Sequence, residues 1–246
     1  GDLLDLAFLD HAQQLHLQFQ RHLADLVQEQ RARVGRRHFP FLMEEVYYDE
    51  IPSLDLADFC GTDAERKKDF VAKLGAAYTN IGFVAIRNHF LSPEIQSNLY
   101  AAIKEFFSLS DKIKSKYEVP GIAGQRGYTG KGKEHAKGRN TGDLKEFYHV
   151  GQELLPAERV LENYPENIWP EEVSGFKSAT TEAYVALEKT GIQMLRAIAL
   201  YLDLPETYFD EKVKRGNSIL RPIHYYPIDD PSGVPADADR RGSGPG

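Results

Sequence analysis

The chain has 246 residues, of which 41% are hydrophobic and 27% are charged, a composition typical of one globular domain with a substantial core. The formal net charge of -7 disfavours general nucleic-acid binding, which needs a basic surface, and the single cysteine excludes an intrachain disulfide. No apolar run approaches the roughly 20 residues that span a bilayer. We therefore expect a cytoplasmic protein with no nucleic-acid and no membrane partner.

The first 42 residues predict a helix, because apolar side chains recur there at helical spacing: Leu6, Phe8, Leu9, Ala12, Leu15, Phe19, Leu23 and Leu26. His11, His16 and His22 lie in the same stretch, but their spacings of 5 and 6 residues do not place them on one helix face as metal ligands. We expect residues 1–42 to form a helical extension that packs on the domain or on a partner.

Two strands and two helices are predicted next. Residues 51–56 and 82–86 are strand-like, and Thr62 with Glu65 forms a capping-box pattern that starts a helix. That helix is expected to bury Phe70, Leu74, Ala77 and Tyr78. The pair Ser92-Pro93 starts the second helix, whose inward positions are Ile95, Leu99, Ile103, Phe106 and Phe107.

Glycine and basic residues interleave between Gly121 and Gly142. No Gly-Lys-Ser/Thr sequence ends this stretch, so a nucleotide-binding loop is only weakly indicated. Two interpretations stay open. The stretch is either a solvated, flexible loop, or Arg126 or Lys131 faces an anionic group of a substrate.

A long helix is predicted from about residue 171 to 203, with a stripe of core positions: Phe176, Thr180, Ala183, Leu187, Gly191, Met194, Leu195, Ile198 and Leu202. A strand follows over Ser218–Pro227. Because successive strand residues point to opposite faces, His224 and Tyr226 should share one face and Tyr225 the other.

Several motifs in a fixed order resemble one enzyme family. They are Ile-Pro-Ser-Leu-Asp-Leu at 51–56, Gly-Phe-Val-Ala-Ile-Arg-Asn-His at 82–89, Glu-Phe-Phe-Ser-Leu-Ser at 105–110 with Lys114 and Tyr117, Gly127-Tyr128, Asp-Leu-Lys-Glu-Phe at 143–147, Asn-Ile-Trp-Pro at 167–170, and His-Tyr-Tyr-Pro at 224–227. Residues 43–228 thus resemble the N-terminal part of the isopenicillin N synthase-like family of non-haem Fe(II), 2-oxoglutarate-dependent oxygenases. The resemblance implies an α+β fold: the N-terminal helices and strands of a double-stranded β-helix, or jelly roll.

The family implies Fe(II) and 2-oxoglutarate as cofactors, with iron held by two histidines and an aspartate that leave positions open for 2-oxoglutarate and dioxygen. None of the eight histidines here is followed two residues later by Asp or Glu. We therefore expect no catalytic residue, no metal ligand and no tight iron binding in this chain. Residues 229–246 do not match the family, so we expect truncation before the metal-binding strands.

The resemblance also implies binding residues. The family's tyrosine before the proline contacts a carboxylate of 2-oxoglutarate or substrate, and Tyr226 matches it. His224 stands where the family usually has an asparagine, and both are predicted to bind the co-substrate. Arg126, Tyr128 and Lys131 are predicted substrate contacts, because the family's matching segment lies near the active-site mouth. His89 and His149 are predicted to be structural.

Two functions remain. The first is the N-terminal portion of an oxygenase that oxidises a small molecule, inactive as given because the iron ligands are absent. The alternative is a non-catalytic binding or regulatory protein on the same scaffold, which meets a partner through residues 1–42. The family's substrates vary widely, so the sequence does not indicate which small molecule is bound.

Overall fold

The computed structural model describes residues 51–122, 124–134, 142–154, 165–216 and 218–226. The predicted helical extension 1–42, the tail 229–246 and the histidines His11, His16, His22, His38 and His135 lie outside these residues. Within the described ranges, no helix is long and apolar enough to cross a membrane.

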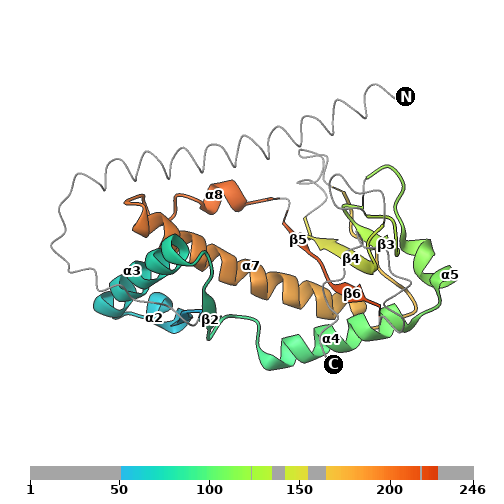
Figure 1. The fold of residues 1–246 in the computed structure, drawn as a ribbon, viewed down its shortest axis with the longest axis horizontal. Coiled ribbons are helices and arrows are strands. Elements are labelled where there is room, and N and C mark those ends of the chain that lie inside the picture. Colours follow the sequence, from blue (N-terminus) through green and yellow to red (C-terminus); the bar gives the residue numbers. More distant parts are fainter. Residues whose placement is uncertain (1–50, 123, 135–141, 155–164, 217, 227–246) are drawn as a thin grey trace, which may run out of the picture. The chain divides into compact units, whose positions relative to one another are not determined.

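The described chain combines helices with short strands (Figure 1). The elements are β1 (Ser53–Asp55), α2 (Leu56–Cys60), α3 (Ala64–Asn80), β2 (Ala85–Arg87), α4 (Pro93–Ser108), α5 (Asp111–Lys114), the 3-10 helix η1 (Ser115–Tyr117), β3 (Gly127–Thr129), β4 (Lys145–Gly151), α7 (Phe176–Tyr201), α8 (Asp210–Val213), β5 (Ile219–Leu220) and β6 (Ile223–Tyr225). This mixture of helices, a parallel strand pair and an antiparallel sheet agrees with the predicted α+β class.

Helix α3 begins one residue later than the capping-box pattern predicts. The N-cap is Asp63, whose carboxylate accepts hydrogen bonds from the backbone N–H groups of Glu65 and Arg66 at 3.0 and 3.2 Å. The prediction of a Thr62 cap is therefore wrong. An ionised carboxylate at the positive end of a helix satisfies two donors at once and gains from the helix dipole, which a hydroxyl does not.

Helix α4 starts as predicted. The Ser92 hydroxyl accepts from the Ile95 N–H at 3.2 Å, and Pro93 occupies the first turn, where its missing N–H costs nothing. The helix buries Ala102, Ile103, Phe106 and Phe107. Phe106 is fully buried and its ring meets those of Tyr128, Tyr148 and Phe176 at centroid distances of 5.8, 5.0 and 5.4 Å, which makes it the centre of the larger core.

Helix α7 joins two hydrophobic clusters, as Figure 1 shows by its course from the sheet to α3. Its first turns, at Phe176 and Ala179, pack with α4 and the sheet, whereas Met194 and Ala197 pack with β1, α2 and α3. The predicted helix is confirmed, but not every predicted core position is.

Some predicted core positions are exposed: Leu187 of α7 and Tyr78 of α3 are each 42% exposed, and Gly191 of α7 is exposed as well. Periodicity locates the apolar stripe of a helix, but it does not tell how far along the stripe a neighbouring element extends.

The first strand pair is parallel, with Leu54 opposite Ile86. After β2 the chain turns at Asn88, whose φ of 51° is left-handed and whose amide donates to the Asp55 carboxylate at 2.7 Å. His89 is exposed at this turn, and the structural role predicted for it stays a prediction.

The second sheet is antiparallel and centres on β4, which pairs with β3 on one side and with β5 and β6 on the other. Gly127 opens β3 at φ 75°, and a Cβ there would lie 2.3 Å from the Tyr117 carbonyl oxygen, so only glycine fits. Arg126, Gly127 and Tyr128 are buried. This part of the glycine-rich stretch is therefore not the solvated loop that was one interpretation of its sequence.

Candidate functional site

Alternation along β4 separates two sets of polar side chains. Glu146, Tyr148 and Val150 share the face that packs against α4 and α7, while Lys145, Phe147 and His149 share the other. Register places His224 directly opposite Glu146 and Tyr225 opposite Lys145. His224 and Tyr226 thus lie on one face, with ring centroids 5.0 Å apart, as the strand alternation predicts.

Glu146 is the centre of the first set. Its side chain is fully buried, and it accepts hydrogen bonds from the Lys114 ammonium at 2.7 Å and the Tyr128 hydroxyl at 2.5 Å. Its other oxygen contacts His224 Nδ1 at 2.7 Å. We call Lys114, Tyr128, Glu146, His224 and Tyr226 the Glu146 cluster.

The charges of the Glu146 cluster support one another. Burial would raise the pKa of the Glu146 carboxyl, but the hydrogen bonds from Lys114, Tyr128 and His224 outweigh it and hold the pKa below its usual range. Burial would likewise lower the pKa of Lys114, but its bonds to Glu146 and Asp111 raise it. Both groups are therefore ionised at neutral pH. Burial and then the Glu146 carboxylate raise the pKa values of Tyr128 and Tyr226, which stay neutral.

His224 and Tyr226, the partly exposed members of the cluster, make further contacts with an aromatic ring and with a lysine. The His224 ring stacks on Phe107 at 5.4 Å with an interplanar angle of 28°. The Lys131 ammonium lies over the Tyr226 ring, 4.9 Å from its centroid, and Lys131 is exposed. Four of the five predicted binding residues, namely Tyr128, Lys131, His224 and Tyr226, are thus brought together.

Arg126 lies apart from them. Its side chain is fully buried against Gly151, where any Cβ would come within 2.1 Å of the guanidinium, and it donates to the Gln125 carbonyl at 2.6 Å. Its predicted contact with a substrate stays a prediction.

A second polar network occupies the opposite face of β4. Arg221 donates to His149 Nε2 at 2.6 Å and to Glu134 at 2.7 Å, and Glu134 also pairs with Lys145 at 2.8 Å. The other ring nitrogen of His149 bonds to the Gly124 carbonyl at 2.5 Å. Burial lowers the pKa of His149 to about 4, against the opposing effect of that carbonyl, so the imidazole is neutral. This agrees with the structural role predicted for His149.

The described residues do not fit an iron site. Among them, no group of three or more His, Cys, Asp or Glu side chains is arranged to hold a metal ion. Both nitrogens of His149 are engaged, Nδ1 of His224 meets Glu146, and His89 is exposed at a turn on another sheet.

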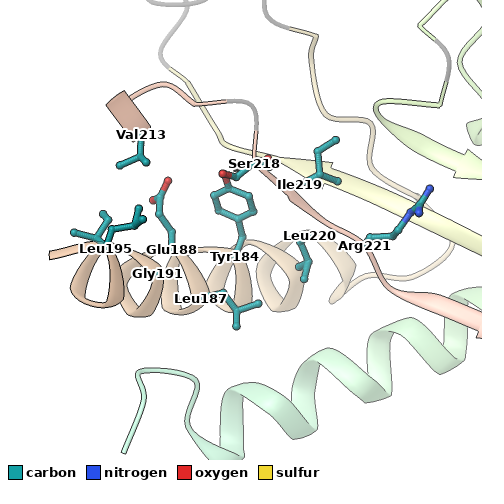
Figure 2. A pocket seen from close by; sticks show the side chains of 11 residues that line it. Tyr184, Leu187, Glu188, Gly191, Leu195, Val213, Ser218, Ile219, Leu220 and Arg221 are labelled. Atoms are coloured by element: carbon teal, nitrogen blue, oxygen red, sulfur yellow. Dashed lines mark hydrogen bonds between the residues drawn. The ribbon is translucent and has the colours of Figure 1, made fainter. Parts of the chain in front are cut away.

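A partly open cavity of about 260 Å³ lies between α7 and the segment Ser218–Arg221 (Figure 2). Leu187, Gly191 and Leu195 of α7 and the segment Ser218–Arg221 are among the residues that line it, and in Figure 2 the Leu187 side chain points away from Ser218 and Ile219. The polar side chains at its edge already have partners, since Tyr184 donates to the Ser218 carbonyl at 3.3 Å and Glu188 accepts from Gln152 at 2.7 Å. Burial raises the pKa of Glu188.

Comparison with known proteins identifies the family. Residues 51–172 match the model described as non-haem dioxygenase in morphine synthesis N-terminal. Proline hydroxylase buaE of Petromyces alliaceus is 33% identical over 183 residues, which are 72% of this chain and 55% of that protein. The chain belongs to the 2-oxoglutarate- and Fe(II)-dependent oxygenase family. The resemblance inferred from its motifs is thereby confirmed.

Two solved structures are similar in fold to this chain. A 2OG-Fe(II) oxygenase family protein from Caulobacter crescentus superimposes with a TM-score of 0.65 at 34% identity, covering 73% of this chain and 57% of that one. A full-length Neurospora crassa protein, solved in complex with alpha-KG, gives a TM-score of 0.61 at 26% identity, covering 71% of this chain and 54% of that one. The chain therefore spans a little over half the length of these relatives.

Sequence reasoning missed Lys114 and Glu146 as members of the site. Both stood in family motifs, but no role was assigned to them. The available signal was Glu146 itself, a charged residue in line with Tyr148 and Val150 on what proves to be the buried face of a strand. Because a buried carboxylate needs a positively charged partner, a glutamate on a buried strand face predicts a cation beside it.

Proposed function

We propose that this chain is the N-terminal portion of a 2-oxoglutarate- and Fe(II)-dependent oxygenase that oxidises a small molecule. Its part in the site is to bind a carboxylate of 2-oxoglutarate or of the substrate through Tyr226 and His224, not to ligate iron. The observation that carries the proposal is the Glu146 cluster, which brings His224 and Tyr226 together at a partly exposed place, with the Lys131 ammonium over the Tyr226 ring.

The relatives support the substrate class. One is named a proline hydroxylase, and the Neurospora crassa protein has also been solved with alpha-KG and thymine. A small molecule that carries a carboxylate, or binds together with one, suits a site where the exposed ammonium of Lys131 lies over the Tyr226 ring. Which small molecule is oxidised depends on residues outside this cluster.

By the same proposal, the 246-residue chain has no turnover of its own, because its sequence contains no His-x-Asp or His-x-Glu. The chain should retain far less than one iron per polypeptide after anaerobic loading and dialysis, and it should not release succinate from 2-oxoglutarate. Stoichiometric iron retained by this chain would contradict the proposal.

The decisive test is the transcript downstream of the Tyr225-Tyr226 codons, read in all frames. The proposal expects a His-x-Asp sequence there, and the longer polypeptide should decarboxylate 2-oxoglutarate in an iron-dependent reaction. A transcript without any such sequence would favour the non-catalytic alternative.

A further inference from the structure

The cavity between α7 and the segment Ser218–Arg221 has a smaller neighbour of about 110 Å³. Tyr184 and Glu188 of α7 line both cavities, and Gln152 and Thr181 line the smaller one. Within the described part of the chain, the walls of both contain no member of the Glu146 cluster. We call the two the α7 cavities.

The smaller cavity is bordered by two buried oxygen atoms without a partner. The Gln152 amide donates to the Glu188 carboxylate at 2.7 Å, because a carboxylate only accepts. Among the described residues, the amide oxygen of Gln152 and the hydroxyl of Thr181 have no hydrogen-bond partner. Two other threonines of α7 differ, since Thr180 and Thr190 donate to the carbonyl four residues earlier at 2.7 and 2.9 Å. Lone pairs at one place thus await a donor.

Negative charge at the same place lacks a strong counter-charge. Within the described ranges, the partner of the Glu188 carboxylate is the neutral Gln152 amide, and burial raises the pKa of its carboxyl against that hydrogen bond. Glu153 also lines the smaller cavity, with Lys177 3.9 Å away. Arg221 lines the larger cavity, but its side chain extends away from Glu188 in Figure 2 and donates to the network on the opposite face of β4. A cationic donor would therefore gain from both charge and hydrogen bonds here.

The larger cavity is mainly apolar. Its walls include Ile192, Leu195, Val213, Ile219 and Leu220. Gly191 also lines it, and a Cβ built there would meet no atom within 4 Å. An apolar cavity of about 150 Å³ is enough to bind benzene, so about 260 Å³ has room for a group of at least that size.

We propose that the α7 cavities bind a small primary amine, whose ammonium group lies among Glu188, Gln152 and Thr181 and whose apolar group occupies the larger cavity. Three oxygen acceptors match the three N–H donors of an ammonium group. The site differs in chemistry from the one proposed for 2-oxoglutarate, because Glu188 and Glu153 would repel a carboxylate.

The experiment is a titration of the ¹⁵N-labelled 246-residue chain with 2-phenylethylamine, followed by NMR at about pH 7.5, where a primary amine is protonated. Saturable shifts are expected at the amides of Gln152 and of residues 181–191, with a Kd of about 1 mM or tighter. 2-Phenylethanol, which has the same ring and no charge, should bind at least about tenfold more weakly.

Three variants separate the charge from the cavity. Glu188→Gln keeps the shape but removes the charge, and should weaken binding of 2-phenylethylamine at least about tenfold. Glu182→Gln is the matched control, because Glu182 is exposed on α7 and is absent from both linings, so its affinity should be that of wild type. Gly191→Leu should fill the larger cavity and weaken binding at least about tenfold without lowering Tm, since leucine favours a helix more than glycine does.

The proposal is overturned if shifts do not saturate up to about 10 mM 2-phenylethylamine, which would mean that water satisfies the oxygen atoms. Equal affinity for 2-phenylethanol, or wild-type affinity in Glu188→Gln or Gly191→Leu, would also overturn it. Thermal melting establishes that each variant is folded, and if Glu188→Gln is not, Gly191→Leu decides. Either result leaves the oxygenase proposal as it stands, because the Glu146 cluster is not involved.

Discussion

Replacing Lys114 by methionine tests the energetics of the Glu146 cluster. The ammonium and the carboxylate are 3% and 0% exposed and lie 2.7 Å apart, so removing one leaves a buried charge without its main partner. Breaking such a pair costs about 3–5 kcal/mol. Tyr128 and His224 still donate to Glu146, and methionine retains the apolar stem, so we expect the lower end, about 3 kcal/mol.

In a domain of this size, about 3 kcal/mol lowers Tm by about 6–12 °C. The lowered pKa of Glu146 means that its contribution is present above the unfolded value and is lost as pH falls. The raised pKa of Lys114 means that its contribution is present below the unfolded value and is lost as pH rises. The difference between wild type and Lys114→Met should therefore be constant between about pH 5 and 10.

Urea denaturation of both proteins measures this difference, and the double variant Lys114→Met/Glu146→Gln should recover part of the loss because no buried charge is left unpaired. A loss under about 1 kcal/mol for Lys114→Met would show that the pair is solvated in solution, and the reasoning from burial would fail.

Three further predictions concern single positions. The depressed pKa of His149 means that the neutral ring stabilises the fold above about pH 6.5 and that this stability is lost as pH falls toward about 4, so His149→Asn should show a flatter urea-midpoint profile over that interval. Gly127→Ala should lower the unfolding free energy measured in urea by more than about 2 kcal/mol, because the positive φ and the clash with the backbone both disfavour alanine. Gly132→Ala should lower it by only about 1 kcal/mol, because that residue has φ 78° but open space around it. Asp63→Ala should lower the unfolding free energy by about 1 kcal/mol, because it removes the N-cap of α3. An equal effect of Thr62→Ala would contradict this and support a cap at Thr62.

The sequence predicted helix starts and strand faces correctly where a single local pattern determines them. Ser92 followed by Pro93 starts α4, because proline cannot sit deeper in a helix. Alternation placed His224 and Tyr226 on one face, because the strand period is fixed at two. At Thr62 and Asp63 two capping residues compete at adjacent positions, and the sequence does not say which backbone N–H groups each can reach.

The Glu146 cluster could not be assembled from sequence in the same way. Its members come from α5, β3, β4 and the end of β6, and their meeting depends on the register of β4 with both neighbours. The family motifs marked Lys114, Tyr128, Glu146 and Tyr226 singly. Glu146 is buried because α4 and α5 pack onto one face of β4, and its buried negative charge then needs the Lys114 ammonium as a partner.

The order in which the cluster's members are made also has a consequence. Lys114 precedes Glu146 by 32 residues, whereas His224 follows it by 78. At a synthesis rate of about 5–20 residues per second, Glu146 waits about 4–16 seconds for His224 after it leaves the peptidyl-transferase centre. During this interval Lys114 and Tyr128 are the available donors from the cluster. A nascent chain would thus hold the α5–β3–β4 part of the sheet together by an ion pair before β6 arrives to complete it.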